Sequence, residues 1–274
     1  MNWSLLATCR SLTDLTLEAI GGLCPELTDA QVDDIRESLG HLHRFAVPMQ
    51  LGNLARFLQP PVTARWRDIG PVRADARTGE LLLRLPSLTS LHLLCHDASP
   101  VVFLSQLPLL TTLHLECFDD AACDALLAAL QLCTGITELN LRCGFISSHW
   151  SALFAKLPLK RLTICGGKLE SLRCFAEGSI TQSLEHLTLA GLALPPSKVA
   201  QLYALRRLRT LALDRCFSSL LAVATLTRLS PPTALLPALT NLSQMPTFMG
   251  VGYQCGGVER QGPSFEWMQA RLTR

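Results

Sequence analysis

The sequence predicts an α/β solenoid in which a parallel β-sheet lines the concave face and helices cover the convex face. Three observations support this class. One pattern recurs as LTSLHLLC at 88–95, LTTLHLEC at 110–117 and ITELNLRC at 136–143. The copies repeat with a period of 22 to 26 residues, and amphipathic segments lie between them. Because one repeat cannot bury its own apolar face, neighbouring repeats must stack on one another.

Each strand copy is marked by the first residue of an L-x-L pair or its equivalent. An early copy has Leu15 as its marker, and two degenerate copies within 42–80 have Phe45 and Ile69. A last candidate has Leu242. We therefore expect about ten repeats, each providing one strand. The clear markers are Leu91, Leu113, Leu139, Leu162, Leu187 and Leu211.

Amphipathic segments between the strands predict short helices. The first of them places Val32, Ile35 and Leu39 on one face, with Thr28 or Asp29 positioned to cap the helix. Repeats near the short end of the length range more often use a 3₁₀ turn in this place. The expected helical segments are 27–39, 118–131, 144–157 and 195–205.

The composition argues against several classes of protein. Of the 274 residues, 49% are hydrophobic and 17% are charged, which fits a heavily buried leucine ladder. The net charge is +2, so bulk electrostatics do not favour a nucleic-acid partner. No apolar run reaches ~18 residues, so we expect no membrane-spanning helix. The first residues lack the pattern of a signal peptide.

The spacing of the eleven cysteines favours buried packing. Cys95, Cys117 and Cys143 occupy one position in three successive repeats, and strand alternation points that position inward. Metal ligation or disulfide bonding is the alternative, but the chain contains no C-x-x-C pair. The odd number of cysteines, with no signal peptide, indicates a reducing compartment, either cytoplasm or nucleus.

The strands, the repeated cysteine position and the helix openings LTDAQV (27–32) and FDDAAC (118–123) resemble the leucine-rich-repeat superfamily. The phrase LCPELTD and the position of Cys216 are similar to its cysteine-containing and ribonuclease-inhibitor-like subfamilies. The resemblance extends over about residues 12–245 and implies a horseshoe fold. Many members are substrate receptors of ubiquitin ligases, with an F-box before the repeats. No F-box is found here, since the first strand begins by residue 12.

The variable residues between the leucines of each strand face the concave side and are small, mixed and polar. Such a lining suits a protein or peptide partner, whereas phosphate groups would require more Arg and Lys. His92 and His114 should be side by side on neighbouring strands. With Glu116 and His96 nearby, a metal site is the alternative to an exposed polar ladder, which we prefer. The predicted partner-binding residues are Ser90, His92, Thr112, His114, Glu116, Glu138, Asn140, Arg142, Arg161, Thr163, His186 and Thr188.

The segment 59–80 is richer in arginine than its surroundings, with Arg65, Arg67, Arg73 and Arg77. Two interpretations remain open for it. It is either a degenerate repeat with an exposed loop or a small basic contact for an acidic partner.

The repeat pattern ends near residue 245, which predicts a leucine-rich-repeat domain over 1–245 and a C-terminal tail or cap over 246–274. GVGYQC at 250–255 is not a dinucleotide fingerprint, because it ends in Cys255 and lacks a strand–helix context. We therefore expect a non-enzymatic scaffold that binds a protein partner, without cofactor, metal or small-molecule substrate. Substrate recognition in a ubiquitin-ligase complex is a more specific version. The alternative is a regulatory or targeting domain of a larger enzyme.

Overall fold

The chain is described here from a computed structural model, which divides it into two compact units. The first unit is Met1–Ile136 and the second is Thr137–Arg274, and each is treated separately below. The structure describes residues 11–16, 28–38, 42–49, 51–59, 66–95, 101–117, 126–146, 148–166, 168–169, 175–176, 178–192, 200–214, 216 and 241–245. The expected C-terminal tail or cap at 246–274 lies outside this description, so the predicted domain boundary stays a prediction.

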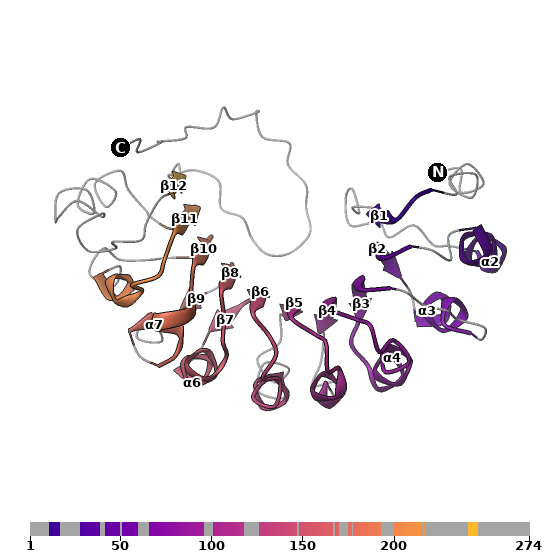
Figure 1. Cartoon of the computed structure of the whole chain (residues 1–274), viewed down its shortest axis with the longest axis horizontal. Helices are drawn as coiled ribbons and strands as arrows, with labels where there is room; N and C mark the ends of the chain where they lie inside the picture. The colour runs from indigo at the N-terminus through magenta and orange to yellow at the C-terminus, as the bar shows by residue number, and fades with distance from the viewer. Residues whose placement is uncertain are drawn as a thin grey trace. The chain divides into compact units, whose positions relative to one another are not determined.

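The strands of the first unit pair in parallel and in chain order (Figure 1). Their markers align across the sheet as the repeat predicts: Leu15 pairs with Phe45, Phe45 with Ile69, Ile69 with Leu91, and Leu91 with Leu113. The two weak copies therefore form strands in register with the clear ones. The strands are β1 (Asp14–Thr16), β2 (Arg44–Met49), β3 (Asp68–Arg73), β4 (Ser90–Cys95) and β5 (Thr112–Cys117).

Aromatic residues fill the core of the first unit where the repeat is degenerate. The Phe45 ring lies 5.0 Å from the Phe57 ring and 5.2 Å from the Trp66 ring, measured between centroids. Phe57 and Trp66 are 5.5 Å apart, and all three side chains are buried. Large rings here occupy the volume that leucines fill in the regular repeats, so the stack continues through the weak copies.

Helices of the first unit lie on one side of its sheet (Figure 1). Thr28 and Gln31 cap the first helix reciprocally: the Thr28 amide donates to Gln31 Oε1 at 2.9 Å, and the Gln31 amide donates to Thr28 Oγ1 at 3.4 Å. The 22-residue repeat between Leu91 and Leu113 uses a 3₁₀ turn, as its length predicts. The elements are α2 (Asp29–Ser38), α3 (Leu51–Phe57), α4 (Ala76–Leu82) and η2 (Val102–Gln106), and residues 126–130 are also helical.

The second unit continues the same repeat. Its markers Leu139, Leu162, Leu187, Leu211 and Leu242 align on neighbouring parallel strands. A separate pair of short parallel strands follows two of these, and the sequence pattern had not indicated it. The main strands are β6 (Glu138–Cys143), β8 (Arg161–Cys165), β10 (His186–Ala190), β11 (Thr210–Asp214) and β12 (Asn241–Met245), and the separate pair is β7 (Phe145–Ile146) and β9 (Lys168–Leu169).

The helical segments of the second unit agree with the sequence only in part. Helix α6 (Ser148–Lys156) buries Trp150, Leu153 and Phe154 as predicted. The segment 195–205 was expected to form an amphipathic helix, and its described part is the 3₁₀ turn η4 (Ala200–Ala204). The 3₁₀ turn is tighter than the expected α-helix and still buries Leu202. A four-residue helix, α7 (Ile180–Ser183), had no sequence signal.

A backbone ladder just before the strands recurs in both units. In the first unit, the amides of His43 and Arg44 both donate to the Thr13 carbonyl, at 2.8 and 3.2 Å. In the second, the amides of Lys160 and Arg161 both donate to the Thr137 carbonyl, at 2.7 and 3.1 Å. The same hydrogen-bond pattern, with the same leucine register, makes both units parts of an α/β leucine-rich-repeat solenoid.

The repeated cysteine position is buried, as the packing interpretation predicts. Cys95 and Cys117 are partners in the register of β4 and β5 and are 2% and 1% exposed. Cys143 is 3% exposed at the end of β6. No disulfide joins the described cysteines. In the part of the chain that the structure describes, no helix has the length and apolar character that crossing a membrane requires.

Candidate partner-binding surface

Strand alternation divides each strand into a buried and an accessible set of side chains. In β4, Leu91, Leu93 and Cys95 are buried, whereas Ser90 and His92 are partly exposed. The same alternation holds in β5, β6, β8 and β10. We call the accessible side the strand face. Its accessible positions include every predicted partner-binding residue, namely Ser90, His92, Thr112, His114, Glu116, Glu138, Asn140, Arg142, Arg161, Thr163, His186 and Thr188.

On the first unit, the predicted residues form a histidine–carboxylate group. His92 and His114 are register partners, with ring centroids 5.8 Å apart and ring planes at 42°. This confirms that the two histidines are neighbours. His92 Nε2 lies 3.2 Å from Glu116 Oε1. This nitrogen makes no hydrogen bond although it is shielded from solvent, so the two groups are close neighbours without a hydrogen bond between them.

A polar network next to this group was missed by sequence reasoning. Arg44 Nε lies 3.0 Å from Asp68 Oδ2, and the Ser90 hydroxyl donates to Asp68 Oδ1 at 3.1 Å. Arg44, Asp68 and Ser90 therefore join β2, β3 and β4 on the strand face. Asp68 precedes the marker Ile69 just as Ser90 precedes Leu91. That shared position was the available signal, and extending the face to the degenerate repeats would have found it.

Gly70 is the second residue on this face that the pattern did not single out. A Cβ placed on it would lie 2.5 Å from the Cβ of His92. The absence of a side chain therefore allows β3 and β4 to approach each other beneath the histidine. Since His92 also contacts Glu116, Gly70 helps to position the group that includes both residues.

The predicted residues of the second unit form rows across the strands. Glu138, Arg161 and His186 are register partners in β6, β8 and β10, and Asn140, Thr163 and Thr188 form the next row. The side chains of Glu138, Arg161 and His186 make no ion pair or hydrogen bond with another described residue. Unlike the Arg44–Asp68 pair, these charged and polar groups keep their hydrogen-bonding capacity for an external ligand.

A metal site was the alternative for the histidine pair. Among the residues that the structure describes, no three His, Cys, Asp or Glu side chains are grouped closely enough to hold a metal ion. His96, the fourth residue considered, lies outside that part of the chain.

The arginine-rich segment 59–80 contains regular structure as well as loop. Arg67 is exposed just before β3, Arg73 ends that strand, and Arg77 is exposed on α4. Arg65 lies outside the described residues. The degenerate-repeat interpretation accounts for the strand and the helix.

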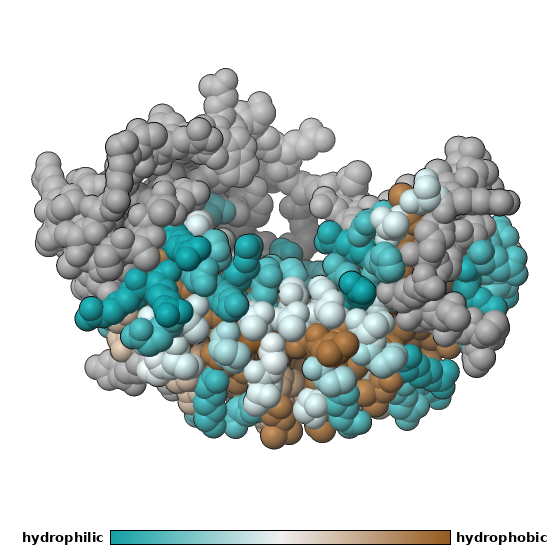
Figure 2. Space-filling view, viewed as in Figure 1, coloured by the Kyte–Doolittle hydropathy of each residue, from teal (hydrophilic) through white to brown (hydrophobic). Residues whose placement is uncertain are grey.

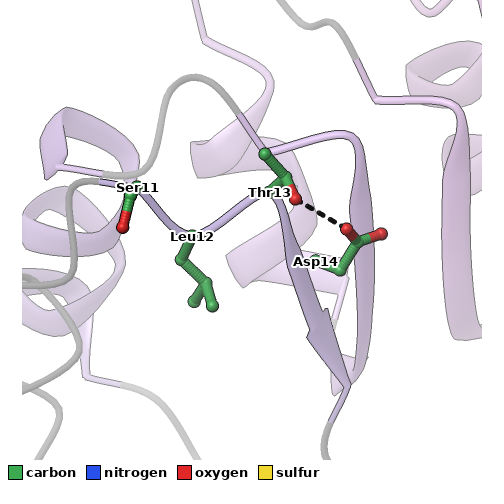
Figure 3. Close-up of a pocket in the computed structure, with 4 residues that line it drawn as sticks. All are labelled: Ser11, Leu12, Thr13 and Asp14. Atoms are coloured by element: carbon green, nitrogen blue, oxygen red, sulfur yellow. Dashed lines mark hydrogen bonds between the residues drawn. The ribbon is translucent and has the colours of Figure 1, made fainter.

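A shallow depression lies at the start of β1. It has a volume of about 450 Å³ and is lined by Ser11, Leu12, Thr13 and Asp14 (Figure 3). The Thr13 hydroxyl donates to Asp14 Oδ2 at 2.7 Å, so these two of its polar side chains hydrogen-bond to each other. The depression contains none of the predicted partner-binding residues, and its small open surface suggests no chemistry.

Comparisons with known proteins identify structures with a distantly similar fold. No protein-family model and no curated protein matches the sequence. Internalin C2 from Listeria monocytogenes is 14% identical over 80% of this chain and 84% of the internalin, with a TM-score of 0.40. The internalin inlF from the same organism is 14% identical over 79% of this chain and 65% of its own, with a TM-score of 0.41.

Proposed function

We propose that this protein is a non-enzymatic scaffold that binds a protein partner through the strand face. The observation that carries the proposal is the separation of roles along each strand. Buried leucines hold neighbouring repeats together, so the accessible residues between them are not needed for the core and project from the sheet. The mixed polar side chains form rows across neighbouring strands, and these rows make a wide recognition surface of modest charge.

A more specific version of this function rests on the family resemblance: the strand face recognises the substrate of a ubiquitin-ligase complex. The alternative is that the repeats are a regulatory or targeting domain of a larger enzyme. We place the protein in the cytoplasm or nucleus, because no disulfide joins the described cysteines and a reducing compartment keeps thiols reduced. The ribonuclease-inhibitor-like subfamily remains our preferred assignment.

Quantitative affinity capture with mass spectrometry tests the proposed function. The 274-residue chain is compared with a variant carrying Thr163→Arg and Thr188→Arg, two register partners on the strand face of β8 and β10. The matched control carries Ala152→Arg and Gln182→Arg, two exposed residues of α6 and α7. Both variants gain the same charge and bulk, so they differ in which surface they block.

The expected result is a set of proteins retained by the wild type and the helix variant but lost from the strand-face variant. Recovery of ligase adaptors in that set supports the receptor version, and recovery of one enzyme's subunits supports the regulatory version. Equal capture by all three chains would contradict binding through the strand face. The histidine group has its own test, because the double substitution His92→Ala and His114→Ala should weaken a partner that contacts the first unit.

A further inference from the structure

Exposed basic side chains gather where two strands of the second unit begin. Lys160 and Arg161 stand at the start of β8, and Arg206, Arg207 and Arg209 lie in the turn that leads into β11. All five are exposed, and Figure 2 shows hydrophilic residues gathered over the turn that leads into β11 in Figure 1. We call these five residues the basic edge.

The backbone places the two halves of the basic edge on either side of one strand. The Glu185 amide donates to the Lys160 carbonyl at 2.9 Å, and the Arg209 amide donates to the Glu185 carbonyl at 2.7 Å. Lys160 and Arg209 are therefore two strand spacings apart, or about 10 Å. A ligand a few residues long can contact cations from both halves at once.

The charges of the basic edge are only partly neutralised by the chain itself. Glu185 Oε2 lies 3.7 Å from Arg209 NH1, which compensates one of the five cations. The side chains of Lys160, Arg161, Arg206 and Arg207 make no ion pair or hydrogen bond to any other residue the structure describes. Most of this positive charge is accordingly available to a ligand, although the whole chain carries a net charge of only +2.

We propose that the basic edge binds an acidic segment of the protein partner, in an extended conformation that crosses the starts of β8, β10 and β11. This inference rests on the proposed function, since the segment belongs to the partner of the strand face. An extended chain advances ~3.3 Å per residue, so carboxylates about three residues apart match the spacing between Lys160 and Arg209. Four of the five cations are arginines, whose planar guanidinium groups bind carboxylates through two hydrogen bonds.

A protein segment fits the basic edge better than a nucleic acid. Glu138 and Glu185 lie among the cations on neighbouring strands, and their carboxylates repel a continuous phosphate backbone. The described part of the edge also contains no Phe, Tyr or Trp on which a base could stack. A peptide can place carboxylates opposite arginines and donors opposite the two glutamates.

The test measures binding of a fluorescein-labelled decapeptide, with glutamate at every third position and serine between, to the 274-residue chain by anisotropy at about 50 mM salt. The edge variant carries Arg161→Glu and Arg207→Glu. The control variant carries Arg84→Glu and Lys156→Glu, which reverse the same charge at two exposed side chains outside the basic edge. We expect the edge variant to lose about tenfold or more in affinity, and the control to stay within about twofold of wild type.

Three outcomes would overturn the inference. The first is that the wild type does not bind the labelled peptide. The second is that the edge and control variants bind the peptide with equal affinity. The third is that a single-stranded oligonucleotide binds more tightly than the peptide through the same arginines. Circular dichroism melting curves of both variants confirm that each remains folded. The capture experiment above changes Thr163 and Thr188 but none of the basic edge. If the peptide still binds but the strand-face variant captures the same proteins as the wild type, the strand-face proposal has failed. If the strand-face variant loses captured proteins but the wild type does not bind the peptide, the basic-edge proposal has failed.

Discussion

Replacing Gly70 with alanine tests how closely β3 and β4 approach each other on the strand face. The new Cβ would lie 2.5 Å from the Cβ of His92, 3.4 Å from its Cγ and 3.5 Å from its Cα. Carbon atoms in contact prefer ~3.5–4.0 Å, so the strands must separate by about 1 Å. Overpacking of this kind costs about 1–3 kcal/mol, and the stiffer unfolded chain returns about 0.4–1 kcal/mol. The free energy of unfolding should fall by about 1–2 kcal/mol.

Urea unfolding, followed by circular dichroism, measures this change, and two backgrounds identify its cause. His92→Ala keeps the Cβ that clashes, so Gly70→Ala should remain destabilising in that background. His92→Gly removes the Cβ, so the cost of Gly70→Ala should largely disappear there. An unchanged urea midpoint for Gly70→Ala in the wild-type background, or equal relief in the two backgrounds, would refute the reasoning.

Three further predictions test the core, an ion pair and the packing between helices. Leu113→Ala should lower the free energy of unfolding by ~2–5 kcal/mol because the side chain is fully buried, and Thr112→Ala should change it by less than ~0.5 kcal/mol; similar urea midpoints for both would mean that the strand phase is wrong. Hydrogen bonds from Arg56 hold the pKa of Asp33 below its ordinary value of 3.8, so this carboxylate stabilises the fold above that pH and the contribution is lost as the pH falls through the lowered pKa. Asp33→Asn should therefore be less stable than wild type in urea at neutral pH, by a difference that shrinks as the pH falls through the lowered pKa of Asp33, and a difference that stays constant on acidification would argue against the ion pair. Gly79→Ala should lower the melting temperature, since the new Cβ would lie 2.6 Å from Cδ1 of the Phe103 ring in η2. A raised melting temperature would show that helix propensity outweighs the clash.

Much of the fold could be predicted because burial imposes a repeat on the sequence. The leucine markers align strand by strand, and even Phe45 and Ile69 take their places in the register. The short pair β7 and β9 and the four-residue helix α7 could not be predicted. Such short elements bury too few residues to show a period, and the path of the chain between strands determines their conformation.

The candidate surface was predictable in outline but not in its internal contacts. Strand alternation alone placed all the chosen side chains on the accessible face. It could not show that Asp68 bridges Arg44 and Ser90, since that contact depends on side-chain reach across three strands. Nor could it show the importance of Gly70, because a glycine adds nothing to a hydrophobic pattern. Sequence reasoning identifies which positions are exposed, whereas pairing between them is a property of the folded sheet.

That pairing has an energetic consequence for recognition. A carboxylate of a partner that approaches Arg44 must compete with Asp68, whose oxygen already lies 3.0 Å from the guanidinium. One that approaches Arg161 displaces only water, because this side chain has no partner among the described residues. The net gain in binding free energy from a carboxylate contact is therefore larger at Arg161, on the second unit, than at Arg44, on the first. We expect alanine substitutions of charged strand-face residues to weaken an acidic partner more on the second unit than on the first, in binding titrations with the same ligand.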